Sequence, residues 1–375
     1  MKKVFKYIGI VFLVLFIVCA ILGKAKTTSA NDFEYSIDHS TNTVTITGLA
    51  DSKSHKEHID IPKKIKGYRV TLIADYAFKG NEKVLTIKFP KTISYIGISA
   101  FENCKNLKSV SGLEKCSDLK TIESKVFSGC YRLRTINLPN NITSIGNCAF
   151  EFCYNLRELS IPDSVSCIGE KAFSNCQSIK EIKIPQGVTK IENQTFLGCA
   201  SMESVILPQG IIHITEGAFD TCMKLKSVVI PNTVTTIEFG AFIKCYSLSS
   251  IDVALDNPVY TSVDGVLYTK NLTELVAYPA GKTDKTFSVP QGVTKIFKYA
   301  FTYNQNLDTL DLPKSLKTIN NLFLYETLIK TINYEGSVSD WNKIATMSAL
   351  DCGDLFESII CTDGQIAKDG TVTYN

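Results

Sequence analysis

Seven cysteines occupy one position of a regular spacing, and their thiols offer more chemistry than any other repeated side chain in the sequence. Successive members recur with a period of 23, and only the first step is longer: Cys104, Cys130, Cys153, Cys176, Cys199, Cys222 and Cys245. Thiols can pair as disulfides, bind zinc or pack as small apolar groups. Which of these applies depends on the structural element that carries the spacing.

Phenylalanine follows the same spacing and indicates what that element is. Consecutive phenylalanines of this series are 23 residues apart, except for one interval of 26, one of 59 and a last one of 22. The series is Phe78, Phe101, Phe127, Phe150, Phe173, Phe196, Phe219, Phe242, Phe301 and Phe323. Units this short cannot bury their own apolar face, so they must stack on one another as a solenoid. The long step from Phe242 to Phe301 exceeds the period by 36, which places an insertion inside one unit.

The unit at 172–194 shows how one coil is built. Isoleucines alternate with lysine over 182–184, which predicts a strand with one buried and one exposed face. Pro185 ends this strand, because proline lacks the N–H that a continuing ladder needs. The segment 188–191 predicts a second short extended stretch, and 172–176 fits a short helical turn. We expect the first strands of successive coils to form one parallel sheet whose two edges are covered.

The stacked coils favour free thiols over disulfides or metal. Equivalent Cβ atoms in neighbouring coils should lie about 4.7–4.9 Å apart, farther than the roughly 3.5–4.5 Å that a disulfide requires. A single row of thiolates also lacks the tetrahedral geometry of a zinc site. The sequence therefore predicts a ladder of buried thiols. Cys352 and Cys361 stand outside the ladder and are candidates for a mutual disulfide.

Catalytic motifs are missing from the sequence. It contains no Gly-x-Ser-x-Gly elbow, no His-Glu-x-x-His pair and no phosphate-binding loop. His55 and His58 could contribute to a zinc site, but two histidines in a polar loop are more typical of a solvated surface. His213 is expected to face outward, with Lys190 and Thr236 as its counterparts in the neighbouring coils. We predict no catalytic residue, no metal site and no cofactor.

The segment 1–30 differs from the rest of the chain. Three lysines precede an apolar run from Ile8 to Gly23, which is typical of a secretory signal peptide. An uncleaved N-terminal anchor is the alternative, and Val18 before Cys19 speaks against a lipoprotein. Either way, the rest of the chain is expected outside the cytoplasm. The net charge of +3 becomes −2 without the five leader lysines, which gives no electrostatic reason to expect nucleic-acid binding.

The repeated pattern Ala-Phe-x-x-Cys-x-x-Leu-x-x-Ile-x-Ile-Pro-x-x-Val-x-x-Ile resembles the BspA-like class of bacterial leucine-rich repeats, and the match covers nearly all of 33–365. The resemblance implies a leucine-rich repeat solenoid, a β-rich right-handed coil of about 23-residue units with a parallel sheet and short helical turns. It also implies a small β-meander at 257–279 and a terminal unit in which Trp341 covers the last coil. One unit departs from the pattern: 102–126 is three residues longer and lacks the Ile-Pro ending, so a bulge or pocket is expected there.

The leader pattern and the resemblance together divide the chain into segments. These are a signal peptide or anchor at 1–30, an N-terminal cap and first strand unit at 31–76, leucine-rich repeats at 77–251, the β-meander insertion at 252–286, final repeats with the terminal unit at 287–344, and a C-terminal tail at 345–375.

Outward-facing residues of the first strands remain as candidates for function. Stacking aligns them in columns, and exposed apolar positions bordered by charge mark the expected contact surface: Glu158, Glu181, Lys183, Ile206 and Val229. These positions could also be ordinary β-forming residues. The resemblance implies a secreted or surface-located, monomeric, non-enzymatic adhesion protein that binds a host matrix or cell-surface protein or glycan. The alternatives are a secreted enzyme with the repeats as a docking arm, or a structural envelope protein.

Overall fold

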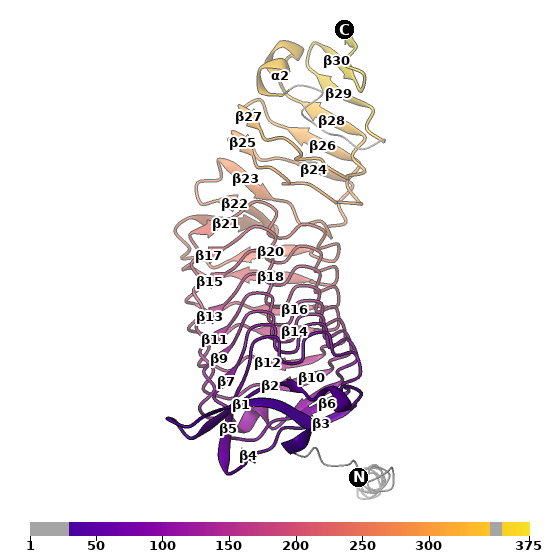
Figure 1. Cartoon of the computed structure of the whole chain (residues 1–375). Coiled ribbons are helices and arrows are strands. Elements are labelled where there is room, and N and C mark those ends of the chain that lie inside the picture. Colours follow the sequence, from indigo (N-terminus) through magenta and orange to yellow (C-terminus); the bar gives the residue numbers. More distant parts are fainter. Residues whose placement is uncertain (1–29, 346–354) are drawn as a thin grey trace, which may run out of the picture.

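From residue 30 onward, the described part of the protein is an elongated stack of coils (Figure 1). This computed structural model describes residues 30–345 and 355–375. Each coil contributes one strand to each of two ladders and returns through a series of tight turns. The solenoid predicted from the 23-residue period is confirmed.

The first ladder holds the Ile-x-Ile strands in parallel. Its members are β3 (His58–Asp60), β6 (Thr86–Lys88), β8 (Ser109–Ser111), β10 (Thr135–Asn137), β12 (Glu158–Ser160), β14 (Glu181–Lys183), β16 (Ser204–Ile206), β18 (Ser227–Ile230) and β20 (Ser250–Val253). Strand hydrogen bonding is not continuous along the row: β3 to β12, β14 with β16, and β18 with β20 form separate sheets. The single uninterrupted sheet expected from the sequence is therefore a row of three shorter sheets up to β20.

The second ladder consists of short strands whose second residue is buried. They are β7 (Tyr95–Ile96), β9 (Thr121–Ile122), β11 (Ser144–Ile145), β13 (Cys167–Ile168), β15 (Lys190–Ile191), β17 (His213–Ile214) and β19 (Thr236–Ile237). The hydrogen-bonded pairs among these strands are parallel, and each pair joins neighbouring coils, as Lys190 pairs with His213. Two ladders thus enclose one apolar interior.

The segment between the second strand and the next coil consists of turns where short helical turns were expected. Lys171 and Asn175 have φ values of 54° and 60°, which a right-handed helix does not allow. The backbone N–H of Phe150 donates to the carbonyl of Ala172 in the next coil at 2.8 Å, instead of to a residue of its own turn. Bonds to the next coil alternate with bonds within the turn, such as that from the Cys153 N–H to the Phe150 carbonyl at 3.1 Å, and no helix forms. In the described residues, the only α-helix is α2 (Val338–Ile344).

Stacked phenylalanines form the spine of the larger core. From Phe78 to Phe242, neighbouring rings lie 5.0–5.6 Å apart and nearly parallel. Every ladder cysteine from Cys104 to Cys245 is buried beside them. A second core begins at the insertion and contains Phe301, Phe323 and Trp341.

The insertion is the β-meander that the sequence predicts. Strands β21 (Tyr260–Val263), β22 (Val266–Thr269) and β23 (Glu274–Ala277) pair antiparallel, and β23 then pairs in parallel with β25 (Lys295–Ile296). Asp264 and Gly265 both have positive φ, as a tight hairpin turn of this length requires. The meander returns the chain to the array, where β24 (Thr286–Ser288), β26 (Thr309–Leu312), β27 (Thr318–Ile319) and β28 (Thr331–Tyr334) continue the two ladders.

The longer unit at 102–126 absorbs its extra residues in a 3-10 turn, η3 (Leu113–Lys115), without losing register. Gly112 precedes it at φ 80°, where an added Cβ would lie 2.2 Å from the carbonyl oxygen of Phe89. Cys116 is buried, and its Sγ lies 3.4 Å from the carbonyl oxygen of Pro90. The extra residues therefore form a local turn between β8 and β9, and the neighbouring strands stay paired.

Both ends of the array are covered. At the N-terminal end, after the 3-10 turn η1 (Ala30–Asp32), β1 (Phe33–Asp38) and β2 (Thr43–Leu49) form a hairpin on β5 (Tyr68–Ile73), with the 3-10 turn η2 (Asp51–Lys53) and the short β4 (Lys64–Ile65) beside it. At the other end, β29 (Ser358–Cys361), β30 (Gly364–Ala367) and β31 (Val372–Tyr374) extend the sheet from β28. Residues 358–374, given above as part of a tail, are thus ordered strands. Trp341 of α2 is buried with its ring 5.4 Å from that of Tyr334.

Two predictions fall on residues outside this description. The leader predicted at 1–30 falls, apart from its last residue, within the undescribed residues 1–29, and Cys352, the proposed partner of the buried Cys361, lies within 346–354. Within residues 30–345 and 355–375, no helix is both long enough and apolar enough to cross a membrane.

Candidate functional site

The five residues proposed from the sequence form a surface on the first ladder, here called the sheet-face patch: Glu158, Glu181, Lys183, Ile206 and Val229. They lie on β12, β14, β16 and β18. All five side chains are exposed, and 60% of the surface of both Ile206 and Val229 is accessible. The alternation of each strand turns the residues between them into the core, as with Ile182, which is 3% exposed.

Register places these residues as the sequence analysis expected. Lys183 lies directly beside Ile206, and Val229 lies on β18, the next strand of the row. Glu158 and Glu181 belong to the adjoining column, which Ser204 continues beside Glu181. The patch therefore joins two columns, one acidic and one apolar with a lysine at its end.

The charged side chains of the sheet-face patch form only weak ion pairs. Lys183 Nζ lies 3.8 Å from the Asp163 carboxylate, and both side chains are more than half exposed, so this pair contributes little to stability. Glu158 and Glu181 line a shallow hollow of about 580 Å³ together with Arg157, Lys180 and Glu203. Such a surface offers apolar contact area and unconstrained charges, which suits binding and brings no nucleophile and base together.

The second ladder carries the outward histidine that the sequence predicted. His213 lies between Lys190 and Thr236 in register, and its Nε2 is 2.7 Å from the Glu238 carboxylate. His58 Nδ1 contacts the Thr86 hydroxyl at 2.8 Å, which is a surface hydrogen bond between neighbouring strands. Within 30–345 and 355–375, no group of three His, Cys, Asp or Glu side chains could hold a metal ion.

The cysteine ladder is buried as predicted, and it also makes a contact that the sequence analysis missed. Each of the seven Sγ atoms lies 3.2–3.3 Å from the carbonyl oxygen of the phenylalanine one coil earlier, as Cys176 does with Phe150. The thiol is a weak donor, so it satisfies a carbonyl while it packs. The sequence does hint at this contact, because the polar Asn304 takes the cysteine position in the second core. Its Nδ2 donates to the carbonyl of Ala280 in the preceding coil at 3.3 Å.

Burial makes these thiols poor nucleophiles. Desolvation raises the pKa of Cys104 and of Cys199 to about 12, and it raises the pKa of Cys130, Cys176 and Cys222 well above the ordinary value. Reactive and metal-binding cysteines need a thiolate, which the low-dielectric interior disfavours. The ladder therefore serves packing and backbone bonding.

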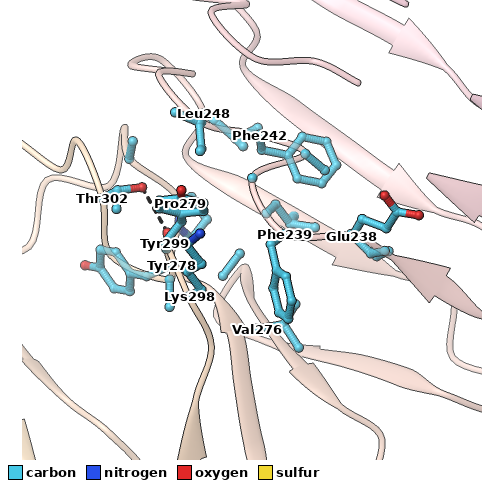
Figure 2. Close-up of a pocket in the computed structure, with 18 residues that line it drawn as sticks. Glu238, Phe239, Phe242, Leu248, Val276, Tyr278, Pro279, Lys298, Tyr299 and Thr302 are labelled. Carbon is cyan, nitrogen blue, oxygen red and sulfur yellow. Dashed lines mark hydrogen bonds between the residues drawn. The ribbon is translucent and has the colours of Figure 1, made fainter. Parts of the chain in front are cut away.

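A crevice at the seam between the two cores was not predicted. Phe239, Phe242 and Val276 lie along one side, and Tyr278, Pro279 and Tyr299 lie along the other (Figure 2). Its enclosed volume is about 40 Å³, far below the roughly 300–1,000 Å³ of a small-molecule site. The stacked row that contains Phe219 ends at Phe242, and on the other side of the crevice Tyr278 stacks on Phe301. The long step in the phenylalanine spacing marks this seam.

Parallel short strands, tight returning turns, and buried phenylalanine and cysteine ladders define a leucine-rich repeat solenoid. A family model described as "BspA type Leucine rich repeat region" matches six copies over residues 71–199, 143–261 and 281–349. These ranges cover more than half of the chain. The chain therefore belongs to the BspA type leucine-rich repeat family.

Solved structures share this fold. A leucine rich cell surface protein from Faecalibacterium prausnitzii A2-165 aligns over 91% of this chain and 96% of its own, with a TM-score of 0.60 and 25% identity. A leucine-rich repeat protein from Bacteroides ovatus aligns over 88% of this chain and 98% of its own, with a TM-score of 0.51 and 21% identity, and it supports the fold alone. Curated proteins yield no match to the chain.

Proposed function

We propose that this protein is an exported, non-enzymatic adhesion or recognition protein that binds a host matrix or cell-surface protein or glycan through the solenoid surface. The observation that carries the proposal is the sheet-face patch. Ile206 and Val229 expose apolar surface on neighbouring coils, and Lys183 lies in register beside Ile206. Exposed apolar residues rimmed by charge are typical of protein interaction sites.

The family and the location of its relatives support this reading. The solenoid offers an extended surface in which residues from many coils act side by side. The similar structure from F. prausnitzii is described as a cell surface protein, and the apolar leader at 8–23 fits export of this chain. The names of the similar structures describe leucine-rich repeat proteins and no enzymatic activity.

Two double variants of the full chain test the proposal. Glu181→Lys with Lys183→Glu reverses both charges and keeps their sum, and Ile206→Asp with Val229→Asp removes the apolar contact. Because all four side chains point away from the core, each substitution should change stability by within about 0.5 kcal/mol. Attachment to a panel of purified matrix proteins and glycans should weaken by about 2 kcal/mol or more, roughly 30-fold, for at least one variant.

A matched control separates the patch from general surface effects. Ile212→Asp with Met223→Asp also replaces two exposed apolar side chains, which are 49% and 42% accessible and lie off the first ladder. We expect the control to bind as the unmodified chain does. Equal attachment by both patch variants, with melting temperatures unchanged, would move the binding surface away from this sheet.

A further inference from the structure

Three of the four arginines of this chain lie close together in the sequence, between positions 132 and 157. The chain holds 40 lysines and arginines, of which only Arg69, Arg132, Arg134 and Arg157 are arginine. Arginine differs from lysine in presenting a planar fork of N–H donors that fits oxyanions in a bidentate manner. Three arginines close together are therefore well suited to binding oxyanions.

The coil register brings these arginines together with two lysines in one line. Lys108, Arg134, Arg157 and Lys180 each follow the buried residue that precedes a first strand, and Arg132 flanks them. The N–H of Arg134 donates to the carbonyl of Lys108 at 3.2 Å, and the N–H of Arg157 donates to that of Arg134 at 2.9 Å. We name these five residues the basic strip. Its members in the line advance along the solenoid by roughly 4.8 Å per coil.

The cations of the basic strip are available to a ligand. All five side chains are exposed, and among the described residues none of the five forms an ion pair, whereas the nearby Lys105 and Lys226 are held at 2.6 Å by Glu82 and Glu203. Unpaired like charges in a row repel one another and attract a polyanion.

One part of the strip is shaped as a recess. Lys108, Arg132, Arg134 and Asn155 line a hollow of about 290 Å³. Asn155 is fixed there because its Nδ2 donates to the carbonyl of Tyr131 at 2.7 Å. Three cationic side chains line one recess, which suits a single tetrahedral anion. Arg157 and Lys180 line the next hollow along the array, together with Glu158, Glu181 and Glu203.

We propose that the basic strip binds a sulfated glycan chain, with one sulfate group in the recess and further sulfates along Arg157 and Lys180. This rests on the proposed function and names the chemical class of the partner. A linear polymer with repeated charges matches a line of cations. A flat anionic membrane would also meet Glu158 and Glu181, which are exposed in the adjoining column and would repel it. A sulfated chain can seat a sulfate group in the recess, whose lining holds no carboxylate, and it meets Glu158 and Glu181 only beside Arg157 and Lys180.

The test is binding of the purified full chain to a heparin fragment of defined length. The strip variant carries Arg132→Ala, Arg134→Ala and Arg157→Ala. The matched control carries Lys91→Ala, Lys120→Ala and Lys317→Ala, which removes the same charge from exposed lysines elsewhere. The strip variant should raise Kd at least about tenfold, because each lost charge-assisted contact weakens binding several-fold. The control should stay within about twofold, and both should keep the melting temperature of the unmodified chain.

Further arms decide the chemistry. Fully desulfated heparin should not bind, and neither a single-stranded oligonucleotide nor vesicles containing phosphatidylserine should bind as tightly as heparin. Equal loss in the strip and control variants, retained binding of desulfated heparin, or tighter binding of the oligonucleotide or vesicles would overturn the proposal. If heparin fails to bind while the chain still attaches to matrix proteins in a manner sensitive to Ile206→Asp with Val229→Asp, the sulfated-glycan inference fails and the proposed function stands.

Discussion

Phe173→Ala tests the phenylalanine spine at its middle. Phe173 is fully buried, and its ring lies 5.6 Å from those of both Phe150 and Phe196, tilted by 6° and 8°. Removal of a buried phenylalanine costs about 3–5 kcal/mol. Because two stacked pairs are lost, each contributing about 0.5–1.5 kcal/mol beyond burial, we expect the upper end of that range.

Phe242→Ala supplies the internal comparison. Phe242 is only partly buried, stacks on Phe219 alone and borders the seam crevice. One stacked pair and less buried area are lost, so this variant should be at least about 1 kcal/mol less destabilised than Phe173→Ala. The comparison holds residue type and coil position constant and varies only the stacking environment.

Urea unfolding, followed by circular dichroism, measures both variants, and native-state hydrogen exchange locates the damage. Because each coil is stabilised by its neighbours, exchange should rise in the coils of Phe150, Phe173 and Phe196 before it rises at the two capped ends. Equal stability losses for Phe173→Ala and Phe242→Ala, or unchanged exchange around Phe173, would refute the stacked-spine reasoning.

Three further predictions concern the side chains that join the coils. Burial raises the pKa of Cys199 from its ordinary value of 9.0 to about 12, so the stability that the protonated thiol contributes is complete below pH 9.0 and falls as pH rises toward 12. Between pH 8 and pH 10 the unmodified chain should lose about 1.4 kcal/mol more than Cys199→Ala in urea unfolding, and identical losses would contradict the burial argument. Alkylation of the native chain should modify the exposed Cys167 and spare the seven ladder thiols until denaturant is added, whereas intact-mass data showing three or more disulfides among the seven would contradict the free-thiol ladder. Asn304 is fully buried, and its Oδ1 accepts from Leu307 N–H at 2.7 Å and from Asn306 N–H at 3.0 Å, so Asn304→Ala should cost about 1–3 kcal/mol in the same unfolding assay. A loss below about 0.5 kcal/mol would show that water replaces the amide.

Repetition made the register predictable. Every unit repeats its core positions, so a single alignment of units placed Lys183 beside Ile206 and His213 between Lys190 and Thr236, as the structure has them. The meander followed from turn residues such as Asp264 and Gly265, whose conformational preferences are local. These features depend on spacing and backbone preference, which a sequence displays directly.

Features that depend on the path of the backbone between coils were not predictable in the same way. The Cys176 contact to the Phe150 carbonyl and the turns around Lys171 arise from bonds between coils: the S–H group bonds to the preceding coil, and the N–H of Lys171 bonds to the next one. The crevice beside Phe242 arises because the meander forms the coil that follows it. The meander does not have the repeat pattern, so the pattern could not predict how the two would pack. The leader and the Cys352–Cys361 disulfide stay predictions.

Hydroxyl-radical footprinting of the full chain, alone and bound to the matrix protein or glycan it attaches to, tests the central claim most directly because it reports side-chain exposure. Ile206 and Val229 are each 60% accessible in the free chain, and the off-ladder Met223 and Tyr246 are 42% and 41% accessible. Recognition through the sheet face predicts that oxidation of Ile206 and Val229 falls on binding while Met223 and Tyr246 react as before. Unchanged oxidation of Ile206 and Val229 in the bound chain would contradict it.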